Sequence, residues 1–170
     1  MMVIGIMSVV GSMAVLQVGS SVPVAKGDGA MRVAIAQLNT ARELSVSQRR
    51  QMQVIFQNTN QIQIVRQEVP AGTTTLSTVS FEGGVVYGLI SGVGDTPDAF
   101  GIHSAVDFGA ANKILFNSDG TLIDQTGNPL NGTVYVTIPN MPRSFRAITI
   151  LGGTGRIRAY RWDGSKWVLV

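Results

Sequence analysis

The stretch that decides the fold is MMVIGIMSVVGSMAVLQVGSSVPVAKGDGAMRVAIAQLNTARELSVSQRR, residues 1–50. Residues 1–18 carry no charge and a single amide, Gln17. As a helix they would extend about 27 Å, at about 1.5 Å per residue, slightly less than the hydrocarbon thickness of a bilayer. A helix that is apolar on all sides needs apolar surroundings on all sides. Residues 1–25 are therefore predicted to form an apolar, membrane-embedded segment, distinct from a globular domain over residues 26–170.

Three interpretations of the apolar start remain open. A cleaved signal peptide would need a basic region before the apolar run, and its best cleavage motifs, Ser12-Met13-Ala14 and Pro23-Val24-Ala25, fit poorly. A membrane anchor fits the length only marginally. A membrane helix that has lost its beginning would explain why the chain starts within the apolar run.

A second helical pattern follows. Residues 19–23 are expected to interrupt the first helix, because Pro23 lacks an N–H donor and clashes with the preceding turn. Asp28 is the predicted N-cap of a new helix over about residues 28–50. One face of this helix is apolar, at Met31, Ala34, Ile35, Leu38, Ala41 and Leu44. The helix is thus amphipathic, and its apolar face is expected to pack on a sheet.

From residue 52 the hydrophobic period changes from 3.6 to 2, which indicates strands. They are predicted at 53–57, 61–66, 76–81, 85–90, 114–116, 121–123, 133–138, 145–151, 156–162 and 166–170. Tight turns are expected at residues 58–60, 117–120 and 163–165, and the last should place Trp162 near Trp167. Residues 91–112 read as a loop. The predicted class is α+β, with a long N-terminal helix packed on an antiparallel sheet.

Composition excludes several kinds of protein. Charged residues make up 14% of the chain and hydrophobic residues 45%, which does not fit a long disordered chain or a coiled coil. Cysteine is absent, so the chain has no disulfide, thiolate metal site or cysteine nucleophile. The single histidine, His103, excludes any site that needs two imidazoles.

The net charge of +3 is unevenly distributed. Residues 26–66 carry six Lys or Arg against two acids, and residues 143–170 carry six against one. Between them, residues 67–142 carry seven acids against Lys113 alone. Such polarity could orient subunits in an assembly or attract a polyanion, and solvated faces that happen to segregate explain it equally well.

Catalytic and metal-binding chemistry finds little support. Asp95, Asp98 and Asp107 lie in one Gly-rich loop and could offer oxygen ligands to Ca²⁺, but their spacing misses the EF-hand pattern. The glycines of residues 152–156 resemble a phosphate cradle, yet no helix pattern follows them, so a hairpin turn explains them better. No nucleophile-elbow motif occurs. We expect no catalytic site, no cofactor and no metal.

Nucleic acid is a further candidate partner. Alternation along residues 156–162 places Arg156 and Arg158 on one strand face with Tyr160 and Trp162, while Arg161 points to the opposite face. Cations interleaved with aromatic side chains can hold phosphates and stack on bases. The possible DNA-binding residues are Arg156, Arg158, Arg161 and Lys166. The alternative is that these cations pair with acidic neighbours or are merely exposed.

The order of these segments resembles a type IV pilin-like protein, and within that superfamily the GspH/FimT group of minor pseudopilins. Residues 1–7 (MMVIGIM) are similar to the later part of the pilin N-terminal signature. Residues 38–50 (LNTARELSVSQRR), followed by Val54-Ile55-Phe56, are similar to the group's helix end and first strand. ILFNSDG at 114–120, RAITI at 146–150 and GRIR at 155–158 are similar to its C-terminal strands. The resemblance covers nearly the whole chain except residues 67–112.

The resemblance implies a structural subunit that acts by assembly in a type IV pilus or a type II secretion pseudopilus. Its helix would sit in the inner membrane, with the domain in the periplasm, and then enter the filament core among other pilins. The implied core residues are Val3, Ile4, Ile6, Val9, Val10, Val15 and Leu16. Some FimT-like minor pilins are linked to DNA uptake, so a DNA-binding minor pilin is an alternative function, as is an anchored or secreted β-rich binding protein.

The start of the chain departs from the family pattern. The basic leader that a prepilin peptidase cleaves, and the glutamate shortly after the cleavage site, have no counterpart before Met1. The expectation is a truncated start, with a leader that the peptidase would remove. A divergent protein that is never processed in this way is the alternative.

Overall fold

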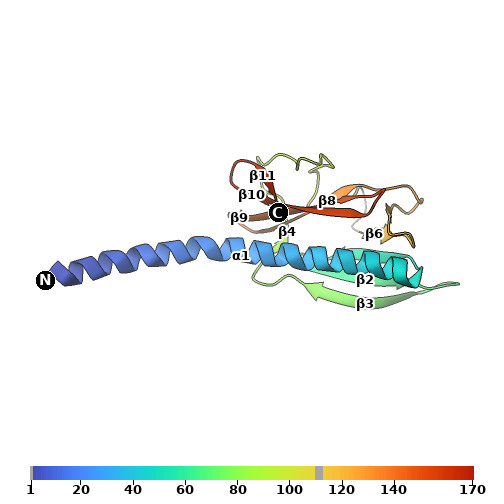
Figure 1. Ribbon diagram of the computed structural model, residues 1–170, viewed down its shortest axis with the longest axis horizontal. Helices are drawn as coiled ribbons and strands as arrows, with labels where there is room; N and C mark the ends of the chain where they lie inside the picture. Colours follow the sequence, from blue (N-terminus) through green and yellow to red (C-terminus); the bar gives the residue numbers. More distant parts are fainter. Residues whose placement is uncertain (1, 110–112) are drawn as a thin grey trace.

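The computed structural model describes the backbone of residues 2–109 and 113–170, and the side chains of these ranges from residue 21 onward. Helix α1 (Met2–Gln48) is followed by eleven short strands (Figure 1). They are β1 (Met52–Gln57), β2 (Gln61–Gln67), β3 (Thr73–Ser80), β4 (Val86–Tyr87), β5 (Val106–Asp107), β6 (Lys113–Phe116), β7 (Leu122–Ile123), β8 (Gly132–Ile138), β9 (Met141–Leu151), β10 (Arg156–Trp162) and β11 (Trp167–Leu169). The predicted α+β class is confirmed.

The predicted break in the helix is wrong. Pro23 lies inside α1, which continues through residues 19–23 without interruption. A proline removes a single N–H from the hydrogen-bond ladder, and a long helix with many neighbouring bonds can continue past it. Asp28 is consequently not an N-cap. It lies within α1, where its carboxylate accepts a hydrogen bond from Arg146.

The strands divide into two antiparallel sheets. The first, here called the β1 sheet, has the order β3-β2-β1-β6-β7. The second, the β9 sheet, has the order β11-β10-β9-β8-β4, with β5 also paired to β8. The C-terminal half of α1 lies alongside both sheets, and its most extensive contact is with β9. The sequence predicted most of the strands, but not β5, which lies within the expected loop of residues 91–112, and not their division between two sheets.

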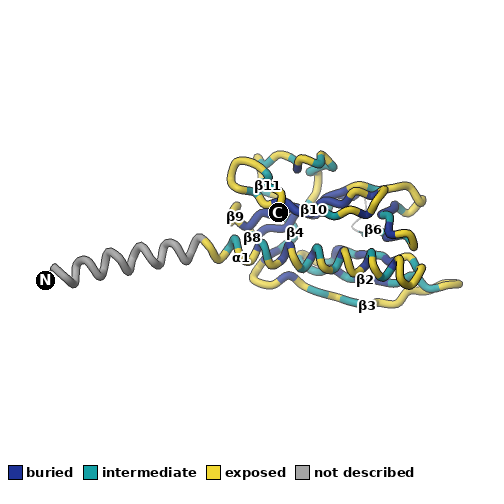
Figure 2. The backbone as a smooth tube through the Cα atoms, viewed as in Figure 1, coloured by how far each residue is buried: buried dark blue, intermediate teal, exposed yellow. Residues whose placement is uncertain are grey.

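The main core lies between α1 and the two sheets. The predicted apolar face of the helix is confirmed, because Met31, Ala34, Leu38 and Ala41 are all buried there (Figure 2). Side chains from both sheets pack against them, including Val54, Ile64, Ile114, Ile148 and Ile150. Burial of several such side chains, at about 1.5–3 kcal/mol each, holds the helix on the sheets.

A second, aromatic core lies on the other face of the β9 sheet. Tyr135, Phe145 and Tyr160 are buried there, and partly buried side chains of the segment 88–105 cover them. The predicted neighbourhood of Trp162 and Trp167 is confirmed: they face each other across β10 and β11, with ring centroids 5.4 Å apart. Both faces of the β9 sheet are therefore covered, which explains why residues 144–150 of β9 are all buried.

Candidate functional site

The contact that fixes the direction of α1 centres on Arg146 of β9. Its side chain has no exposed surface, and its Nε donates to Asp28 Oδ1 on α1 at 2.7 Å. Its Nη2 donates to the Val24 carbonyl of α1 at 3.1 Å, and its Nη1 donates to the Arg143 and Phe145 carbonyls. One guanidinium thus joins the helix to the strand at two successive turns. We call this set of contacts the Arg146 clamp.

The helix backbone lies very close to β9 beside this clamp. A Cβ atom at Gly27 would lie 2.4 Å from the Ser144 carbonyl oxygen, so no larger residue fits without displacing the helix. Breaking a buried ion pair by removing one partner typically costs about 3–5 kcal/mol, because the other charge is left buried and uncompensated. The Arg146 clamp, in which the arginine is fully buried and Asp28 partly so, is therefore a strong polar fastening of the helix.

A second fastening lies near the C-terminal end of α1. Arg42 donates from Nε to the Gly120 carbonyl at 3.2 Å and from Nη2 to the Thr154 carbonyl at 3.1 Å. Gly155 has a φ of 62°, and a Cβ there would meet the Gly120 carbonyl oxygen at 2.1 Å. Arg42 thus ties the β6–β7 and β9–β10 turns to the helix. The antiparallel pairing of β9 with β10 confirms that residues 152–155 form a hairpin turn between them.

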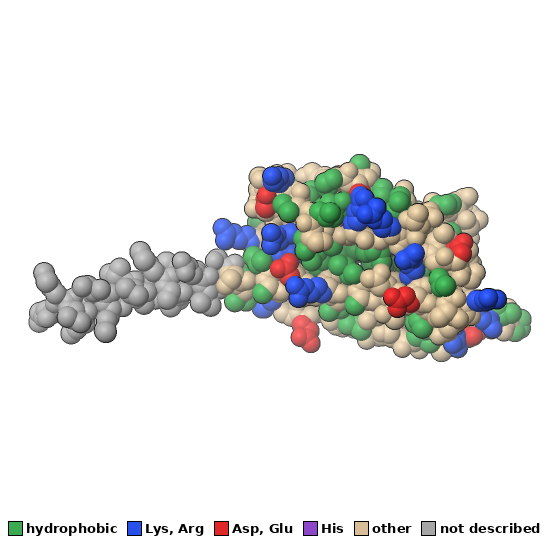
Figure 3. Space-filling view, viewed as in Figure 1, with side chains coloured by type: hydrophobic (Ala, Val, Ile, Leu, Met, Phe, Trp, Pro, Cys, Tyr) green, Lys and Arg blue, Asp and Glu red, His purple; other side chains and the backbone are tan. Residues whose placement is uncertain are grey.

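A groove runs between α1 and the strands β10 and β11. Its cavity has a volume of about 730 Å³, and its lining is Ile35, Asn39, Arg42, Thr154, Arg156, Ile157, Arg158, Ala159, Leu169 and Val170. All the charged residues of this lining are arginines. Figure 3 shows the hollow between the helix and the β9 sheet, which lies above the helix in this view. Hydrophobic side chains lie in the hollow, and Lys or Arg side chains lie above it. We call it the α1–β10 groove.

The structure does not bring the four predicted DNA-binding residues together as one free cationic surface. Arg158 forms an ion pair with Asp98 at 2.5 Å. Arg156 lies exposed at the α1–β10 groove, whereas Arg161 and Lys166 are exposed outside its lining. The DNA contact therefore stays a prediction, with Arg156 the one member of the set that is both exposed and in the groove.

Asp98 belongs to the segment 88–105 and fastens it to the β9 sheet. Besides Arg158, it accepts hydrogen bonds from Thr149 Oγ1 at 2.6 Å and from the Tyr160 hydroxyl at 2.9 Å. Burial opposes ionisation of Asp98, but the hydrogen bonds from Thr149 and Tyr160 and the pairing with Arg158 hold its pKa below the ordinary value. Asp98 is therefore ionised near neutral pH and neutralises Arg158.

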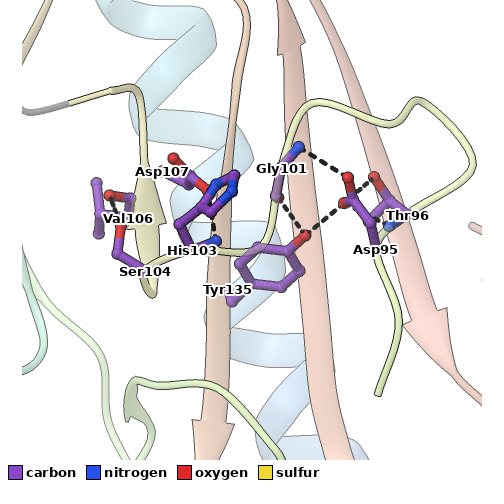
Figure 4. A network of polar contacts seen from close by, with 8 residues as sticks. All are labelled: Asp95, Thr96, Gly101, His103, Ser104, Val106, Asp107 and Tyr135. Atoms are coloured by element: carbon purple, nitrogen blue, oxygen red, sulfur yellow. Dashed lines mark hydrogen bonds and ion pairs between the residues drawn. The ribbon is translucent and has the colours of Figure 1, made fainter. Parts of the chain in front are cut away.

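Asp95, in the same segment, and Asp107, in β5, take separate structural roles (Figure 4). Asp95 accepts from the Tyr135 hydroxyl at 2.8 Å and from the Gly101 N–H at 2.7 Å. Burial, together with this hydrogen bond to Asp95, raises the pKa of Tyr135 above its ordinary value, so the hydroxyl stays a donor. Asp107 accepts from the backbone N–H of His103 at 2.7 Å. The three acids do not converge on one point.

No group of three His, Asp or Glu side chains in the described part of the chain could hold a metal ion. The imidazole of His103 lies 3.1 Å from Asp107, but the His103 side chain is 89% exposed. A general base needs a positioned partner as well as a nucleophile within hydrogen-bond reach. The arrangement in Figure 4 instead joins the segment 88–105 to the sheet.

The predicted filament-core residues Val3, Ile4, Ile6, Val9, Val10, Val15 and Leu16 have side chains outside the described part of the structure. Within the described part, no helix is both long enough and apolar enough to cross a membrane. The membrane segment and the boundary between residues 25 and 26 stay predictions.

Sequence patterns did not identify the residues that hold α1. They predicted Asp28 as an N-cap and indicated no contact for Arg42. Strand alternation does indicate that Arg146 is buried, because it shares a strand face with Ile148 and Ile150, which are both fully buried. A charged residue in phase with core residues of a strand indicates a buried partner elsewhere in the chain.

The fold has counterparts among solved structures. No protein-family model matches the sequence, and no curated protein matches it. The type IV minor pilin FimU of Pseudomonas aeruginosa is similar with a TM-score of 0.55 at 18% identity, over 83% of this chain and 91% of that chain. The minor pseudopilin EpsH from the type 2 secretion system of Vibrio cholerae gives 0.54 at 11% identity, over 83% and 99%. The chain therefore has a pilin-like fold of the kind found in minor pilins and pseudopilins.

Proposed function

We propose that the chain is a structural subunit of a type IV pilus or a type II secretion pseudopilus, and that it acts by assembly rather than by turnover. The observation that carries this proposal is the likeness in fold to a minor pilin and a minor pseudopilin over 83% of the chain. The GspH/FimT resemblance of the sequence points in the same direction.

The fastening of α1 supports this role. A filament subunit that packs through its N-terminal helix has to transmit the position of that helix to its outer domain. The Arg146 clamp and the Arg42 contacts hold α1 to both sheets at points 14 residues apart along the chain, Asp28 and Arg42. In the proposed assembly, residues 1–25 lie in the inner membrane as a single pass and then pack among equivalent helices, with the β domain facing outward.

Deletion and complementation in the host test the proposal. Loss of the gene should lower the number of surface filaments or the secretion of substrates. The wild-type gene should restore both, and an Arg146→Ala variant should restore them less well than the exposed control Arg161→Ala. Normal filament number and normal secretion in the deletion strain would contradict the proposed role.

Processing is part of the same proposal. The genomic sequence upstream of Met1 is expected to encode, in frame, a basic leader, a glycine, a hydrophobic residue and a glutamate shortly after. A prepilin peptidase would then be a partner of the precursor. An in-frame stop codon directly before Met1 would exclude the leader.

A further inference from the structure

Strand β10 is paired along nearly its whole length on one side only. Strand β9 pairs with β10 from Arg156 to Arg161. On the other side, β11 pairs only with residues Tyr160 to Trp162, and its last contact is the Val170 N–H donating to the Ala159 carbonyl at 3.0 Å. Within the described part of the chain, no strand pairs with this side of residues 156–158. The first part of β10 is thus an open edge.

The backbone groups at this open edge belong to Ile157. In an antiparallel ladder, alternate residues direct both their N–H and their C=O to the same neighbour. Ala159 directs its carbonyl to the β11 side, so Ile157 directs its N–H and C=O to that side too. An unpaired edge of this kind offers a donor and an acceptor to another strand.

The α1–β10 groove lies directly beside this edge. The groove takes its lining from both faces of β10, from the end of β11 and from α1. The wall formed by α1 includes Ile35, Asn39 and Arg42. A strand that lay in line with β11 and paired with Ile157 would therefore enter the groove with β10 on one side and α1 on the other.

We propose that the α1–β10 groove binds an extended peptide segment that pairs with the open edge of β10, in line with β11. The side chains of this segment are alternately acidic and apolar. The side chains of such a segment point alternately to the two faces of the sheet. On one face they meet Arg156, which has no ion-pair partner in the described part of the chain. On the other face they meet Ile157 and Ile35. Acidic residues suit the first face and apolar residues the second.

Charge favours a peptide with carboxylates over DNA as the occupant. The groove has an apolar part, and Asp98 already neutralises Arg158, so the groove offers little unpaired positive charge beyond Arg156 and Arg42. Tight binding to DNA needs several free cations along the phosphate backbone. The inference rests on the proposed function in one respect, since in a filament the peptide segment would belong to a neighbouring subunit.

The test uses the full chain in an uncharged detergent and a labelled octapeptide of alternating aspartate and valine with blocked ends. Binding is measured by fluorescence anisotropy, and protection of the Ile157 amide by hydrogen exchange. One control peptide replaces aspartate with lysine. A second carries N-methyl groups on the valines, which face Ile157 in the proposed register and would lose their backbone hydrogen bonds.

The aspartate peptide should bind and slow exchange at Ile157, and both control peptides should bind at least about tenfold more weakly. Arg156→Glu should weaken binding by about tenfold, whereas Arg161→Glu, on the same strand but outside the groove lining, should change it less than about twofold. Equal binding of the lysine or N-methyl peptide, or binding without protection of Ile157, would overturn the proposal. Protection of Ile157 by duplex DNA at physiological salt, with none by the peptide, would also overturn it and assign the groove to nucleic acid.

The two proposals fail separately. If the peptide does not bind while the deletion strain lacks filaments, the chain is a filament subunit and the groove assignment is wrong. If the peptide binds as expected while the deletion strain has normal filaments and secretion, the groove assignment holds and the proposed function is wrong.

Discussion

Arg146 and Arg156 lie on neighbouring strands, yet their surroundings are opposite. The Arg146 side chain has no exposed surface and donates hydrogen bonds to Asp28, Val24 and two carbonyls of its own strand. Arg156 is exposed at the α1–β10 groove, without an ion-pair partner in the described part of the chain. The same side chain therefore fixes the fold at one position and remains available to a partner at the other. Burial and partners, not residue type, separate the two roles.

Removing the buried arginine should have the largest effect. Arg146→Ala is expected to lower the free energy of unfolding by about 3–5 kcal/mol, because Asp28 loses its partner while the side chain's space becomes a cavity. Arg156→Ala should change the same free energy by less than about 0.5 kcal/mol. Chemical denaturation of both variants measures the contrast. Equal effects would show that the Arg146 clamp does not hold the helix.

The hairpin turn between β9, which carries Arg146, and β10, which carries Arg156, provides the next test. Gly155→Ala should destabilise the fold by about 1–3 kcal/mol, because it places a Cβ at positive φ and against the Gly120 carbonyl. Gly153→Ala is the matched control, since its Cβ would meet nothing within 4 Å and it has no positive φ. Thermal unfolding compares the two variants. A similar Tm for both would contradict the close packing of the turn on Arg42.

Arg158 is intermediate between the buried Arg146 and the exposed Arg156, because it is partly exposed and Asp98 neutralises its charge. Asp98→Asn should cost about 1–2 kcal/mol near neutral pH, from lost charge-assisted hydrogen bonds. The pKa of Asp98 is lowered in the folded state, so its contribution is present above the unfolded pKa of about 3.9 and is lost as pH falls through the lower folded value. The difference between wild type and variant should be constant above about pH 5 and shrink in acid. A difference that grows in acid would contradict the assignment.

The smallest expected effect concerns DNA. The full chain should bind duplex DNA weakly at low salt and lose most of this binding near physiological salt, because few phosphates are neutralised. Arg156→Ala/Arg158→Ala should reduce the dependence on salt by about one phosphate contact or fewer, since Asp98 already pairs with Arg158. Electrophoretic mobility-shift assays at two salt concentrations measure the binding of DNA by the wild type and the variant. Tight binding that resists salt would contradict this prediction, and absence of binding at low salt would remove DNA as a partner.

Local signals predicted the elements well. Alternation gave the strands, Asp119-Gly120 gave the β6–β7 turn, and the helical spacing from Met31 to Ala41 gave the buried face of α1. Each of these signals depends on residues that are close together in the sequence, so it can be recognised without the structure. The prediction failed at Pro23, where the weak local preference for a break yielded to a long continuous helix.

The candidate sites depend on contacts that are distant in sequence. Asp28 and Arg146 are 118 residues apart, and Arg158 and Asp98 are 60 apart. Single-sequence patterns show that a charge is present but not which charge it meets. The open edge at Ile157 was equally hidden, because it depends on where β11 stops relative to β10.

Two carboxylates help to hold the segment 88–105 on the β9 sheet, alongside its apolar packing on the aromatic core: Asp95 accepts from Tyr135, and Asp98 from Thr149, Arg158 and Tyr160. The chain contains no cysteine. Many exported domains secure a long loop with a disulfide, which requires an oxidising compartment and its enzymes. Here the contacts that hold the loop do not depend on the redox environment. Acid that protonates Asp98 would weaken them, whereas a reducing agent would not.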